Sequence, residues 1–87
     1  MLRDAGFFGD QELILIYIAR KLKEALALEE VLTSAGLDYL IETDTYVGGF
    51  VFRRERVGAF FYVAPETTRT AVELLARNGY EPYEPGE

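Results

Sequence analysis

The chain has 87 residues, which is enough for one domain, near the lower size limit for folding without disulfides or a structural metal. It has no cysteine and no histidine, which removes disulfides, thiolate chemistry, imidazole catalysis and most metal sites. Fifteen acidic against nine basic residues give a net charge of −6, which argues against a general role on nucleic acids or anionic membranes. We therefore expect a cytoplasmic protein with no catalytic residues, no cofactor and no metal.

A strand–helix–strand pattern occurs twice in the chain. We expect residues 1–11 and 85–87 to be tails and residues 12–84 to form one domain. The first copy has a strand, a helix and a strand at 12–19, 22–35 and 39–43. The second copy has the same three elements at 59–63, 66–78 and 81–84.

The strand composition predicts where each strand lies in the sheet. The strands at 12–19 and 59–63 are apolar on both faces, as in central strands. Pro82 cannot donate to a ladder, which confines the last strand to an edge. Right-handed crossovers then give an α+β, ferredoxin-like β-α-β-β-α-β sandwich with an antiparallel sheet in the order 4-1-3-2.

Both helices lie on one face of such a sheet, so the other face is left open. Strand alternation places an apolar set on that face, which consists of Leu13, Leu15, Tyr17, Phe60 and Tyr62. Two interpretations are open. Either the N-terminal tail with Phe7 and Phe8 folds over this face, or the face is a homo-oligomer interface, in a dimer or trimer. We favour the second.

Residues 44–58 form a connection far longer than a hairpin needs. They contain the pair Gly48-Gly49, an apolar triplet at 50–52 and three arginines. Long loops in small domains are often functional. The alternative is an extended hairpin in which residues 50–52 pair with residues 57–60 across Arg54-Glu55.

Six of the nine basic residues fall at one end of the predicted fold, where the first helix begins and the long connection lies. They are Arg20, Lys21, Lys23, Arg53, Arg54 and Arg56. A helix start adds free amides, so this end predicts a site for an anion or an acidic partner. Ordinary solvated charges are the alternative. The candidate binding residues are Arg20, Lys21, Tyr46, Gly48, Gly49, Arg53, Arg54 and Arg56.

The arrangement resembles the small bacterial domains described as signal-transducing proteins, which are related to the PII-like fold. The resemblance spans about residues 13–78 and rests on the segments 15–19, 24–26, 31–39 and 62–66. It implies trimers that pack their sheets inward, nucleotide clefts between subunits, and target contact through the loop between strands two and three. The Gly-Lys-rich phosphate loop of PII proteins has no match in residues 77–82, so no ligand residue is carried over.

These observations predict a non-enzymatic regulatory or interaction module. It would self-associate through the open sheet face and contact a protein partner through residues 44–58. The alternative is a sensor that binds an anionic metabolite among Arg20, Lys21, Arg53 and Arg56. Neither hypothesis involves nucleic acid or membrane.

Overall fold

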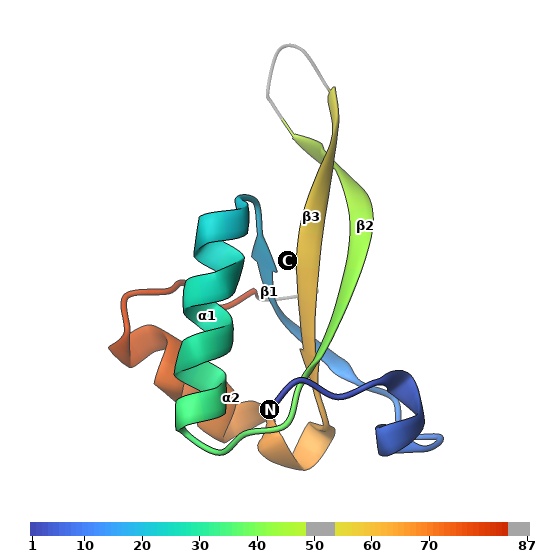
Figure 1. The fold of residues 1–87 in the computed structure, drawn as a ribbon, viewed down its shortest axis with the longest axis vertical. Coiled ribbons are helices and arrows are strands. Elements are labelled where there is room, and N and C mark those ends of the chain that lie inside the picture. The colour runs from blue at the N-terminus through green and yellow to red at the C-terminus, as the bar shows by residue number, and fades with distance from the viewer. Residues whose placement is uncertain (49–53, 84–87) are drawn as a thin grey trace.

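The computed structural model describes residues 1–48 and 54–83, which form an α+β fold with three strands and two α-helices (Figure 1). The strands are β1 (Ile14–Ala19), β2 (Leu40–Gly48) and β3 (Arg54–Val63), and they form an antiparallel sheet in the order β1-β3-β2. The helices are α1 (Leu22–Ser34) and α2 (Thr68–Arg77), with short 3-10 helices η1 (Ala5–Phe8) and η2 (Pro65–Thr67).

The predicted four-strand order 4-1-3-2 is wrong in one respect, because the described residues form no fourth strand. Residues 81–83 are irregular, and Tyr83 donates one backbone hydrogen bond to the carbonyl of Ile16 over 2.7 Å. The preceding Pro82 has no N–H, which prevents a regular ladder at that position. β1 is therefore an edge strand in the described sheet and β3 alone is central. The observed order is compatible with part of a ferredoxin-like sheet. Residue 84 lies outside the described residues.

Both helices pack on one face of the sheet, and the core lies between these two layers (Figure 1). α1 buries Ala25, Leu28 and Leu32, which recur every three to four residues as a single helix face requires. α2 buries Ala71 and Leu75 on its own inner face. The chain leaves α1 through Gly36, whose φ of 76° is accessible to glycine at little cost.

A β-bulge in β1 reverses the predicted orientation of Tyr17. The register runs from Leu15 opposite Tyr62 to Tyr17 opposite Phe61, so Ile16 is an extra residue. Because Phe61 is buried in the core, its neighbour Tyr17 also lies on the helix side of the sheet. Tyr17 therefore does not belong to the open face, where simple alternation places it.

The N-terminal segment is packed against the sheet, although we expected residues 1–11 to be a tail. Leu2 forms a parallel bridge with Tyr39, and Arg3 Nε lies 2.8 Å from a carboxylate oxygen of Asp38. Phe8 is 6 % exposed, whereas Phe7 remains 51 % exposed. η1 lies away from the two helices, at the end of the sheet where β2 begins (Figure 1). Residues 1–3 therefore contact the rest of the fold, and Phe8 is buried.

The segment 44–58, which we expected to be a long loop, contributes both strands of an extended hairpin. Its pairs run from Asp44 opposite Gly58 to Gly48 opposite Arg54. The hairpin alternative was therefore right in kind but wrong in register, because Arg54 and Glu55 pair with β2 and do not form the turn. The predicted triplet 50–52 lies outside the described residues.

β1 supports only the lower part of this hairpin. The last pair between β1 and β3 is Ala19 with Ala59. Residues 44–48 and 54–58 therefore project beyond the end of β1 as a two-stranded ribbon (Figure 1). We call these ten residues the arm.

Candidate interaction surface

The outer edge of β2 carries no partner strand beyond its first residues in the described part of the chain. The N–H and C=O of Tyr39 both point to this edge, where they bond Met1 and Arg3 over 3.1 and 2.8 Å. The backbone N–H and C=O groups of alternate residues in a strand point to the same side. The backbone groups of Ile41, Thr43 and Thr45 therefore face this outer edge as well. The N–H of Thr45 donates to the side chain of Asp44 over 2.7 Å, which is consistent with an unpaired edge.

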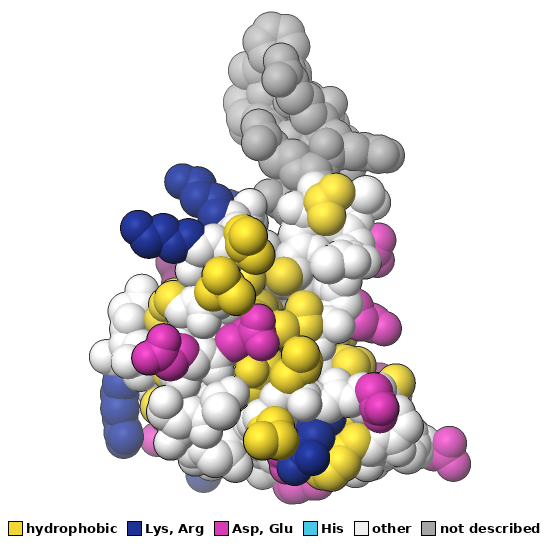
Figure 2. Space-filling model, viewed as in Figure 1, with side chains coloured by type: hydrophobic (Ala, Val, Ile, Leu, Met, Phe, Trp, Pro, Cys, Tyr) yellow, Lys and Arg dark blue, Asp and Glu magenta, His cyan; other side chains and the backbone are white. Residues whose placement is uncertain are grey.

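The side chains along this edge are exposed and mostly acidic or hydroxylic. Residues 42–45 are all exposed, and Glu42 and Asp44 share the open face of the sheet with Phe60 and Tyr62. Burial raises the pKa of the Tyr62 phenol, and the nearby negative charges of Glu42 and Asp44 raise it further. Figure 2 shows acidic side chains along the outer side of β2 and basic ones at the upper end of α1.

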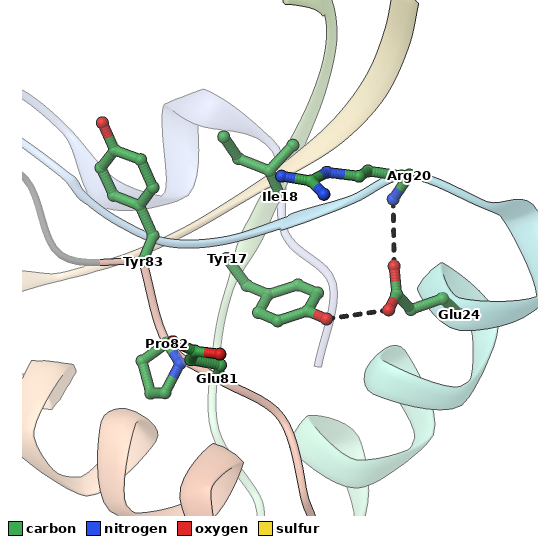
Figure 3. A pocket seen from close by; sticks show the side chains of 7 residues that line it. All are labelled: Tyr17, Ile18, Arg20, Glu24, Glu81, Pro82 and Tyr83. Atoms are coloured by element: carbon green, nitrogen blue, oxygen red, sulfur yellow. Dashed lines mark hydrogen bonds between the residues drawn. The ribbon is translucent and has the colours of Figure 1, made fainter. Parts of the chain in front are cut away.

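A cavity of about 560 Å³ lies between β1, the start of α1 and the C-terminal segment (Figure 3). Glu24 lines this cavity and bonds two other lining residues. One of its carboxylate oxygens accepts from the Tyr17 hydroxyl over 2.8 Å, and the other accepts from the Arg20 backbone N–H over 3.0 Å. Glu24 is the third residue of α1, where such a carboxylate reaches back to free amides. The Tyr17 ring also makes an edge contact with Tyr80, with centroids 5.6 Å apart.

This cavity offers little for acid–base catalysis. Burial, together with the hydrogen bond and charge of Glu24, raises the pKa of Tyr17 to about 12. A phenol with that pKa stays protonated at neutral pH and cannot act as a base there. Glu24 and Glu81 both line the cavity beside Arg20, so an anion bound there would meet two carboxylates.

The basic residues of the predicted site come from two parts of the fold, and of the described ones only Arg20 lines the cavity described above. Arg20 follows β1 and Lys21 is the N-cap of α1. Arg54 and Arg56 lie in the arm opposite Gly48 and Tyr46. The cavity in Figure 3 is lined by Arg20 but not by Lys21. The remaining candidates, Gly49 and Arg53, lie outside the described residues.

The five residues of the predicted oligomer interface do not all lie on one face of the sheet. Leu15, Phe60 and Tyr62 are partly buried and lie on the open face, and Leu13 precedes β1. Tyr17 instead joins the helix side, and Ile18 opposite Phe60 joins the open face. Sequence alternation missed Ile18 because nothing in the residue pattern signals the bulge.

No family model matches the chain, and neither the search of curated proteins nor that of solved structures found a match. Within residues 1–48 and 54–83, no group of three or more acidic side chains is placed to hold a metal ion. The described helices are too short or too polar to span a bilayer.

Proposed function

We propose that the protein is a non-enzymatic regulatory or interaction module that contacts a protein partner through the β2–β3 hairpin. The observation that carries the proposal is the arm, which projects beyond β1. A two-stranded ribbon without a third strand or a helix against it is marginally stable in water. The arm also exposes Val57, an apolar residue that is 66 % accessible. A partner that covers the arm would stabilise it and bury this side chain.

Site-specific photo-crosslinking tests this proposal. A photoreactive residue at Thr43, which is exposed on β2, should link the protein to a distinct partner in the cells that express it. The matched control is the same residue at Thr70, which is exposed on α2. Partner adducts at Thr70 with none at Thr43 would show that the helices, and not the hairpin, form the contact surface.

The open face of the sheet is the basis for the second part of the proposal, which is self-association. Leu15, Ile18, Phe60 and Tyr62 are only partly buried there. A contiguous apolar face of this kind is typical of an interaction surface. The hairpin between the second and third strands would then correspond to the target-binding loop of PII-like proteins, with which we propose a relationship.

Sedimentation velocity tests self-association. Phe60→Lys should convert the oligomer to monomer, because a charge would have to enter a desolvated contact. Thr70→Lys on exposed α2 adds the same charge and should leave the sedimentation coefficient unchanged. A wild-type protein that remains monomeric at high micromolar concentration would disprove this part. The sensor hypothesis has less support, because Arg20 shares its cavity with two carboxylates.

A further inference from the structure

The outer edge of β2 can accept another strand. The chain's own N-terminal segment pairs with it at Tyr39 through two backbone hydrogen bonds. The segment then turns away, because Asp4 caps η1 by accepting from the N–H of Phe7 over 3.1 Å. Beyond that point the outward groups of Ile41 and Thr43 have no strand beside them in the described structure. Within the described part of the chain, the N-terminal segment therefore covers the edge only at Tyr39, and the backbone groups of the next residues of β2 remain open to another strand.

The charge at this edge selects among occupants. Glu42 and Asp44 lie two residues apart on one face, and neither forms an ion pair with a described basic side chain. A second copy that paired antiparallel about Thr43 would place Glu42 opposite Asp44 at both contacts. Like charges directly opposite each other in a sheet are destabilising, whereas opposite charges stabilise. The edge is therefore suited to a basic strand, and unsuited to a second copy in that register.

We propose that the outer edge of β2, over residues 41–45, binds an extended peptide that carries basic side chains two residues apart. The peptide's backbone bonds the outward groups of Ile41 and Thr43, and its basic side chains lie beside Glu42 and Asp44. This mode adds a strand to an exposed sheet edge. The inference names the class of partner for the hairpin and so rests on the proposed function.

The two carboxylates also act on groups next to them in the sheet. The charges of Glu42 and Asp44 are felt by the Tyr62 phenol on the neighbouring strand, whose pKa they help to raise. Asp44 also accepts the outward N–H of Thr45, so one edge amide is capped locally while those of Ile41 and Thr43 stay available. A bound strand would use these two available amides first.

Fluorescence anisotropy with a labelled eight-residue peptide of alternating lysine and threonine, blocked at both ends, tests the inference on the full chain. The double variant Glu42→Gln, Asp44→Asn should weaken binding about fivefold, from two cross-strand ion pairs of about 0.5 kcal/mol each. The control variant Glu30→Gln, Glu73→Gln removes two exposed charges from the helices and should change the affinity less than twofold. Equal weakening by both double variants would overturn the inference in favour of non-specific attraction.

N-methylated peptides separate strand pairing from charge. In a strand, the backbone N–H groups of alternate residues point to the same side. In the bound peptide, the N–H groups that point to β2 therefore belong either to the lysines or to the threonines. One peptide is N-methylated at every lysine and another at every threonine, and we expect one of the two to lose binding and the other to keep it. Thr43→Pro removes an outward N–H on an edge strand and should also abolish binding, provided that circular dichroism shows an intact fold.

Unchanged binding by both methylated peptides, or by a peptide with its lysines in one block, would overturn the inference. A second copy would be the occupant if unlabelled protein displaced the peptide and dimerised through β2. Failure of the peptide to bind, together with partner crosslinking at Thr43, would refute the basic-strand inference and leave the proposed function standing. Absence of crosslinking at Thr43 would refute the function itself.

Discussion

Replacement of Glu24 by glutamine tests the organisation of the cavity beside β1. The Glu24 carboxylate accepts two hydrogen bonds, from the Tyr17 hydroxyl and the Arg20 amide. Glutamine is neutral and has one accepting oxygen, so both charge-assisted bonds are lost, and only its NH2 group can still reach the Tyr17 oxygen, as a donor. A hydrogen bond to a charged group contributes about 1.5–3 kcal/mol, and exposure at Arg20 favours the lower end, about 1.5 kcal/mol. For a domain of this size that corresponds to a fall in Tm of about 6–12 °C.

A double-mutant cycle with Tyr17→Phe isolates the shared hydrogen bond. Tyr17→Phe alone should lower the free energy of unfolding by about 1 kcal/mol. The double variant should lower it by at least about 0.5 kcal/mol less than the sum of the two single effects, because both variants remove the charge-assisted bond from the Tyr17 hydroxyl to the Glu24 carboxylate. Urea denaturation with an unchanged m-value measures each term.

A cycle between Tyr17→Phe and the exposed Glu73→Gln is the control and should be additive within about 0.5 kcal/mol. If the cycle with Glu24 were equally additive, the hydrogen bond would contribute nothing and our description of the cavity would be refuted.

Three further predictions concern the core, pH and the N-terminal segment. Leu32→Ala, fully buried on α1, should cost about 2–5 kcal/mol in a urea titration, whereas exposed Glu30→Ala should cost less than about 0.5 kcal/mol; similar midpoints would refute the orientation of α1. Tyr17 holds its proton more tightly when folded, so its contribution is complete below pH 10 and is lost as the pH rises towards 12; wild type should therefore lose more stability over that range than Tyr17→Phe, and equal losses would contradict the raised pKa. Phe8→Ala should cost about 3 kcal/mol and Phe7→Ala under about 1 kcal/mol, and equal small effects would mean that the segment behaves as a tail.

Periodicity predicted both helices, because helix formation follows a local pattern, and the crossover rule placed the third strand between the first two. The helices predicted at 22–35 and 66–78 lie within two residues of α1 and α2 at each end. The strand at 59–63 was placed correctly but began too late. Its first five residues pair with the end of β2, and the charged and glycine residues there do not resemble a buried strand.

The errors came from interactions that no local pattern reveals. The bulge that turns Tyr17 towards the helices depends on how β1 registers against β3. The bridge between Leu2 and Tyr39 joins segments 37 residues apart (39 minus 2). Residues 81–83 approach β1 through one hydrogen bond and then form no ladder in the described chain.

The central claim is that the β2–β3 hairpin is the contact surface for a protein partner. Hydrogen exchange, measured with and without the partner that crosslinking identifies, tests it most directly. Partner binding through the hairpin should slow exchange of the outward amides of Ile41 and Thr43 on β2 while exchange in α2 stays unchanged. Slowed exchange confined to α1 or α2, with the β2 amides unaffected, would contradict the assignment of the hairpin as the contact surface.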